Sequence, residues 1–207
     1  MKSLNKAFLV ALIAALPIVA APIRVDFTAQ ITTVAGNFYG VTSTDNGTIV
    51  SGFFQYDTAV LDSNGNVQRG DYLHAGLSDF QVNLPGAVVA SGDGSAFVEV
   101  EDFGGADTFR FREGNCGSCG GAITVNGFSD PNALLLFAFS GSFFSNDALP
   151  VPFPFTGATP HTMSIADGNS TVLLQYQTLT PAEVPEPATI LLTGVALLGL
   201  AWRRRQS

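Results

Sequence analysis

Residues 97–112 read FVEVEDFGGADTFRFR, two runs of alternating residues joined by Gly104 and Gly105. Adjacent glycines accept the positive backbone φ angles that a two-residue hairpin turn requires. Each run alternates apolar and polar residues with the period of a strand that has one buried face. The segment therefore predicts a β-hairpin.

The register of this hairpin follows from the same residues. Pairing outward from the two glycines places Val98 opposite Phe111 on one face and Glu99 opposite Arg110 on the other. A shift of one residue would mix the apolar and charged sides. The sequence thus predicts which face of the hairpin is buried, and an ion pair on the opposite face.

Similar alternation recurs along the chain. Glycine or proline interrupts it about every ten residues, and the intervening runs are rich in Phe, Val and Thr, which is typical of short antiparallel strands. No stretch before residue 188 carries a helical apolar stripe. The predicted strands span residues 25–34, 48–56, 74–84, 96–103, 106–113, 122–128, 134–144 and 172–177.

Phenylalanine supplies the predicted core. Of the 17 phenylalanines, 16 fall between residues 27 and 155. Several hairpins with such an interior indicate an all-β domain, an antiparallel, jelly-roll-like β-sandwich over residues 22–180. The proline-rich residues 148–160 suit an extended loop or an edge.

The net charge of this domain limits the classes of molecule that it can bind. Residues 22–183 contain 16 acidic and 4 basic side chains, a net charge of −12. Proteins that bind nucleic acid rely on cations that replace the counterions of the phosphates. We therefore expect no nucleic-acid partner.

The N-terminus has the pattern of a secretory signal peptide. Lys2 and Lys6 precede an apolar stretch at residues 7–20, and Ala20 and Ala21 end it with small side chains. The apolar stretch is shorter than the ~20 residues that a membrane span needs. We expect residues 1–21 to be a signal peptide that signal peptidase removes after Ala20 or Ala21.

The C-terminus combines three features in order. Pro185, Glu186 and Pro187 precede an uncharged apolar segment at residues 188–202, and Arg203, Arg204 and Arg205 follow it. As a helix the segment would be ~22 Å long, which is shorter than the ~30 Å hydrocarbon core of a membrane. Trp202 and the arginines would therefore have to lie at one membrane interface. We predict a linker at residues 181–187, one transmembrane helix at 188–202 and a basic cytoplasmic tail at 203–207.

This tail closely resembles the PEP-CTERM sorting signal, which consists of a Pro-Glu-Pro triplet, a short span and a basic cluster. The resemblance implies processing by an exosortase, an enzyme of Gram-negative bacteria that make extracellular polysaccharide. It assigns Pro185, Glu186 and Pro187 as the recognition element. The implied route is export, transient anchoring in the inner membrane with the domain in the periplasm, and then the cell surface or the medium.

Two cysteines lie in the segment GNCGSCGG. Cys116 and Cys119 have the spacing of a local disulfide, a redox pair or half of a zinc site. An exported compartment favours the disulfide. The surrounding glycines argue against the helix that a redox pair requires, and the two histidines have no metal-type spacing.

A third motif has alternating oxygen ligands. Asp62, Asn64 and Asn66, with Asp71 nearby, have the spacing of a calcium loop. The motif departs from an EF-hand, because Gly65 is fourth in the loop and Leu73 twelfth. An ordinary Asn-Gly turn between strands is the alternative. No other cofactor is expected.

Glu99 and Glu101 lie two apart on one strand face, as an acid and base pair for sugar hydrolysis could. The register places Arg110 opposite Glu99, so paired charges on a solvated face are the alternative explanation. No G-x-S-x-G nucleophile motif occurs.

Three functions remain open at this point. The leading hypothesis is a non-enzymatic surface or matrix protein associated with exopolysaccharide and biofilm. The alternatives are a secreted carbohydrate-active enzyme and a calcium-dependent adhesion module.

Overall fold

The computed structural model describes residues 22–74, 80–92, 95–102, 107–114, 122–130, 134–141, 146–150, 153 and 161–183. The predicted signal peptide, the two cysteines and the predicted sorting and anchor segment lie outside these residues. No helix within the described part of the chain is long and apolar enough to cross a membrane.

The described residues form strands and two short 3₁₀ helices, η1 (Ser43–Asp45) and η2 (Pro85–Ala87). The strands are β1 (Pro22–Ala35), β2 (Ile49–Asp57), β3 (Arg69–Leu73), β4 (Phe80–Leu84), β5 (Val88–Ser91), β6 (Phe97–Glu101), β7 (Asp107–Gly114), β8 (Ile123–Val125), β9 (Phe128–Asp130), β10 (Leu134–Gly141), β11 (Thr162–Ala166) and β12 (Thr171–Glu183).

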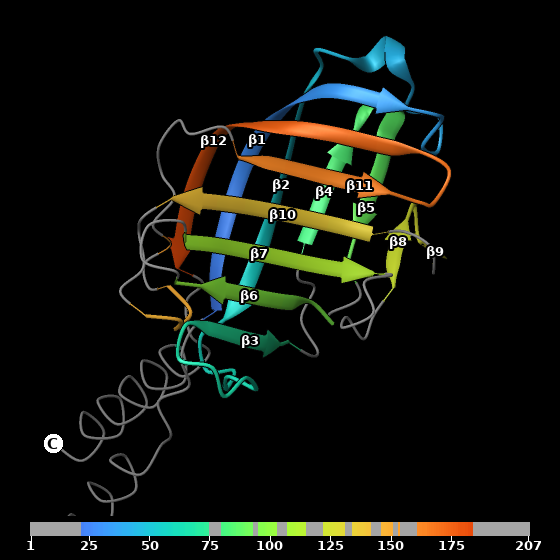
Figure 1. Cartoon of the computed structure of the whole chain (residues 1–207). Helices are drawn as coiled ribbons and strands as arrows, with labels where there is room; N and C mark the ends of the chain where they lie inside the picture. Colours follow the sequence, from blue (N-terminus) through green and yellow to red (C-terminus); the bar gives the residue numbers. More distant parts are fainter. Residues whose placement is uncertain are drawn as a thin grey trace, which may run out of the picture. The chain divides into compact units, whose positions relative to one another are not determined.

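All of these strands join one sheet in the order β3-β6-β7-β10-β11-β12-β1-β2-β4-β5-β8-β9 (Figure 1). Every pairing between them is antiparallel. The two longest strands, β1 and β12, are neighbours at the centre of this order and join its two halves. The predicted antiparallel all-β class is therefore confirmed.

The pairing of β1 with β12 connects the two ends of the domain. It runs from Ile23 opposite Glu183 to Ala35 opposite Thr171, with two register shifts along the way. The first and last strands in sequence are thus hydrogen-bonded neighbours. This closure cannot form until the whole domain has been synthesised.

The sheet folds back on itself, so that its two halves face each other across a phenylalanine core. The ring of Phe54 on β2 lies 5.7 Å from that of Phe111 on β7 and 5.9 Å from that of Phe139 on β10. Phe153 lies 5.4 Å from Phe54 and closes the cluster. Figure 1 shows β2, β4 and β5 behind β7 and β10. The predicted phenylalanine core is present, and the finer jelly-roll-like sandwich stays a prediction.

The hairpin of residues 97–112 has the predicted register. Val98 pairs with Phe111 and Glu99 with Arg110 along β6 and β7. Val98 and Phe111 are completely buried, as the apolar face requires. The turn at Gly104 and Gly105 lies outside the described residues.

Several boundaries differ from the sequence prediction. The prediction missed three short strands, β3, β5 and β11. The predicted strand 74–84 contributes only β4, because His74 follows β3 and residues 75–79 are outside the described part. The predicted strand 122–128 is divided into β8 and β9, since Asn126 and Gly127 have φ angles of 51° and 82° and form the turn between them. An Asn-Gly pair favours such a turn.

The predicted linker begins too early. Strand β12 continues to Glu183, so residues 181–183 belong to the sheet. Pro181 pairs with Val25 of β1 although it has no N–H to donate. Only residue 184 then separates this strand from Pro185.

The core predicts a sharp contrast between two adjacent phenylalanines. Phe54→Ala removes a completely buried ring and should lower the free energy of unfolding by about 3–5 kcal/mol. Phe53→Ala, on the opposite side of β2, removes a half-buried ring that contacts Arg24 and should cost about 1 kcal/mol. Urea unfolding of the mature protein measures both. Equal losses would contradict the assignment of the buried face.

Candidate functional site

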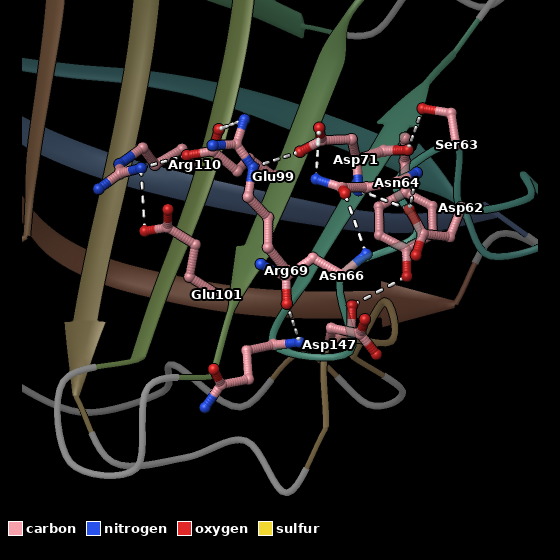
Figure 2. A network of polar contacts seen from close by, with 12 residues as sticks. Asp62, Ser63, Asn64, Asn66, Arg69, Asp71, Glu99, Glu101, Arg110 and Asp147 are labelled. Atoms are coloured by element: carbon pink, nitrogen blue, oxygen red, sulfur yellow. Dashed lines mark hydrogen bonds and ion pairs between the residues drawn. The ribbon is translucent and has the colours of Figure 1, made fainter.

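A network of charged side chains covers the outer face of β3, β6 and β7 (Figure 2). In these strands Asp71 lies opposite Glu99, which lies opposite Arg110. Arg69 lies opposite Glu101 in the next row. The central strand thus supplies two glutamates, and both neighbouring strands supply arginine.

Glu99 is the centre of this network. Its Oε2 lies 2.8 Å from Arg69 Nη2, and its Oε1 lies 3.0 Å from Arg112 Nη2 and also pairs with Arg110 Nη1. Glu101 Oε2 accepts hydrogen bonds from Arg110, at 3.0 Å, and from the Thr108 hydroxyl, at 2.5 Å. Both carboxylates therefore share one guanidinium group.

The predicted pairing of Glu99 with Arg110 is confirmed, but the predicted solvated face is wrong for the glutamates. Only 2% of the Glu99 side chain is exposed, whereas its three arginine partners are 27–38% exposed. The three guanidinium groups contact the carboxylate and shield it from water. A buried carboxylate is tolerated because it is paired with cations.

The geometry bears on the hydrolysis hypothesis. An acid and base pair needs room between its carboxylates for the sugar or for water. Here Arg110 Nη1 contacts both Glu99 and Glu101 and occupies the position between them. Both carboxylates thus accept hydrogen bonds from an arginine side chain, which lies where a sugar or a water would have to bind.

The candidate calcium residues do lie close together, next to β3 (Figure 2). Asp62 Oδ1 accepts the backbone N–H groups of Asn64 and Asp71, both at 2.8 Å. Asn64 Oδ1 accepts the N–H of Asn66 at 3.1 Å. Side-chain oxygens thus hold successive turns of the loop, as Asn and Asp commonly do.

Asp71 completes this loop. Its Oδ1 accepts from Arg69 Nε at 2.9 Å, and its Oδ2 accepts from Asn64 Nδ2 at 3.0 Å. Ser63 donates its N–H and its hydroxyl to the Asp71 carbonyl, so the loop covers part of the outer edge of β3. Within the described residues no group of three His, Cys, Asp or Glu side chains could hold a metal ion. The turn explanation accounts for these contacts, and calcium binding stays a prediction.

The two histidines are buried in different surroundings. His74 accepts the Asp57 N–H through Nδ1 at 3.2 Å, and burial lowers its pKa to about 4, against an opposing effect of Asp57. The His161 ring lies 4.9 Å from that of Phe139, and burial lowers its pKa as well. Burial therefore favours the uncharged form of both imidazole rings at neutral pH.

Sequence reasoning missed Arg69 and Asp71 as members of the ion network. It assigned Asp71 only to a calcium loop, because β3 was not recognised as a strand. The alternation of Arg69, Asp71 and Leu73 around buried Gly70 and Tyr72 was the available signal. Cys116 and Cys119 lie outside the described residues, so their disulfide stays a prediction.

Comparison with protein-family models identifies the motif in the C-terminal segment. Residues 183–205 match the family model described as PEP-CTERM protein-sorting motif. The chain carries a PEP-CTERM sorting motif. This confirms the predicted resemblance and indicates an exported protein whose membrane anchor is processed by an exosortase. The match contains the predicted residues Pro185, Glu186, Pro187, Arg203, Arg204 and Arg205.

No curated protein and no solved structure is significantly similar to the chain.

The ion network predicts a large effect of removing one carboxylate. Glu99→Gln leaves three guanidinium groups without their shared anion and should lower the free energy of unfolding by about 3 kcal/mol. Asp26→Asn, which removes the exposed partner of Arg24, should cost less than about 1 kcal/mol. Urea unfolding provides the comparison. A catalytic role would instead give loss of turnover in Glu99→Gln with little loss of stability.

Burial of His74 predicts a dependence of stability on pH. Its folded pKa of about 4 lies below the unfolded value of 6.5, so the unfolded chain takes up a proton first. The free energy of unfolding should fall as the pH drops from 6.5 to 4, by up to ~3 kcal/mol from this residue. His74→Asn keeps an acceptor for the Asp57 N–H and should lose this part of the slope. Identical slopes of unfolding free energy against pH in both proteins would be inconsistent with the assignment.

Proposed function

We propose that this protein is a non-enzymatic component of the bacterial cell surface or extracellular matrix that associates with exopolysaccharide in biofilms. Signal peptidase removes residues 1–21, and residues 188–202 hold the chain in the inner membrane with the domain in the periplasm. Exosortase processing then delivers the domain to the surface or the medium. In this proposal the folded sheet acts as a jelly-roll-like sandwich, a rigid body that presents its outer faces.

The observation that carries the proposal is the sorting motif directly behind β12. The motif match begins at Glu183, which pairs with Ile23 near the start of β1. The domain therefore begins and ends in the same strand pair. This arrangement supports the proposal, because the two ends of the domain lie side by side in the sheet.

The absence of enzymatic activity in this proposal is supported by the state of the candidate acids. Glu99 and Glu101 are held by Arg69, Arg110 and Arg112 rather than facing an open site. Charges that satisfy one another stabilise a strand surface. The ion pairs support a structural role for the two carboxylates.

Deletion of the gene tests the matrix role. The deleted strain should retain less polysaccharide at its surface and form less biofilm, measured by sugar content of washed cells and by adhered biomass. Complementation with the full chain should restore both. Unchanged retention, aggregation and biofilm in the deletion strain would contradict the proposal.

Processing of the tail provides a second prediction. Glu186→Gln changes the centre of the Pro-Glu-Pro triplet and should leave the tail uncleaved in the membrane fraction. Asp26→Asn, which lies outside the matched residues 183–205, is the control and should be processed normally. Mass spectrometry of membrane and supernatant fractions gives the mature ends. Equal processing of both variants would show that the triplet is not the recognition element.

A further inference from the structure

We propose that the outer face of strands β12, β1, β2, β4 and β5 binds uncharged polysaccharide. This inference rests on the proposed function and deepens it by naming the binding surface and the class of sugar. These five strands are successive neighbours in the sheet (Figure 1). Their side chains alternate between the buried core and this outer face, here called the hydroxyl–amide face.

The first row of this face consists of small hydrogen-bonding groups on β12, β1, β2 and β4, and it ends at Val89 on β5. Thr178 pairs with Thr28, Thr28 with Ser51, and Ser51 with Asn83. Adjacent strands lie about 4.8 Å apart, so the row presents hydroxyl and amide groups at a regular interval. Thr178, Ser51 and Asn83 are exposed. Such groups both donate and accept hydrogen bonds, as sugar hydroxyls do.

The second row runs parallel to the first. In register across the same strands lie Thr180, Asp26, Phe53, Gln81 and Ser91. Phe53 adds an aromatic ring to the polar row. The Arg24 guanidinium lies over this ring, so the aromatic surface is covered on one side.

The two rows together carry no net charge, although the domain is strongly acidic. The one carboxylate in these two rows, Asp26, accepts from Arg24 Nε at 2.9 Å and Nη2 at 2.7 Å. The Arg24 guanidinium also lies 3.8 Å from the centroid of the Phe53 ring. The domain as a whole carries 16 acidic and 4 basic side chains. A polymer that bears carboxylates would be repelled by this net charge, whereas an uncharged one would not.

Contacts within the face hold its side chains in place. The Thr28 and Thr178 hydroxyl oxygens are 2.8 Å apart, and Gln81 Nε2 donates to Asn83 Oδ1 at 2.8 Å. Asn83 Nδ2 donates to the Ser51 carbonyl at 3.2 Å. Side chains that are already ordered lose less conformational entropy when a ligand binds. The outer face of β3, β6 and β7 differs, because ion pairs cover it.

The test uses polysaccharide from the producing cells, separated by anion exchange into uncharged and acidic fractions. Full-length protein in mild detergent is run through native gels that contain either fraction, at low and high salt. We expect retardation by the uncharged fraction that does not depend on salt. We expect little retardation by the acidic fraction at low salt.

Matched variants locate the surface. Ser51→Glu/Thr178→Glu places two charges in the first row and should weaken binding by about tenfold or more. Leu73→Glu/Ser129→Glu adds the same charge at exposed positions of β3 and β9 and should leave binding unchanged. Ser51→Ala/Asn83→Ala is a milder variant for the case that the first fails to fold, judged by its thermal melt, and should also weaken binding.

The outcomes separate this inference from the proposed function. Folded protein that is not retarded by the uncharged fraction, or equal losses in the face variant and its control, would overturn the hydroxyl–amide face. If the deletion strain still lost polysaccharide, the matrix role would stand and another surface would serve it. An unaffected deletion strain together with absent binding would overturn both.

Discussion

The pairing of the first strand with the last is the constraint on which the rest of this structure depends. Hydrogen bonds run between β1 and β12 from Ile23 opposite Glu183 to Ala35 opposite Thr171. These two strands join the half-sheet that contains Phe54 to the half-sheet that contains Phe139, and the core forms where the halves meet. The pairing of the two ends encloses the rest of the domain in one loop, and the entropic cost of closing a loop grows slowly with its length. A domain closed in this way is complete only when its C-terminal strand has emerged.

This closure connects the fold to the route of the protein. The sorting motif begins at the last paired residue of β12, and β1 begins directly after the predicted signal peptide. The strand pair that closes the domain therefore lies, in sequence, next to both the predicted signal peptide and the sorting motif. The two halves of the sheet differ in the side chains on their outer faces. One half carries an ion network centred on buried Glu99, and the other carries an uncharged row of hydroxyl and amide groups.

The sequence was most informative where local and long-range signals agree. In residues 97–112 the turn and the alternation of both strands specify one register, so the pairing of Glu99 with Arg110 could be predicted. Strand β3 could not, because five residues that include a glycine carry little pattern and their partner is distant in sequence. The end of β12 was taken for a linker since Thr and Pro weaken its pattern, although pairing with β1 holds it in the sheet. Burial of Glu99 depends on arginines from two neighbouring strands, which no local window contains.

A cross-link between the first and last strands tests this account most directly. The Thr28 and Thr178 side chains are in contact, with 2.8 Å between their hydroxyl oxygens. In the exported protein, Thr28→Cys/Thr178→Cys should form a disulfide between these positions, identified by mass spectrometry of peptides. Thr28→Cys/Thr180→Cys, shifted by two residues along β12, should form little. Efficient cross-linking of the shifted pair, or of neither pair in folded protein, would contradict the closure of the domain by its two ends.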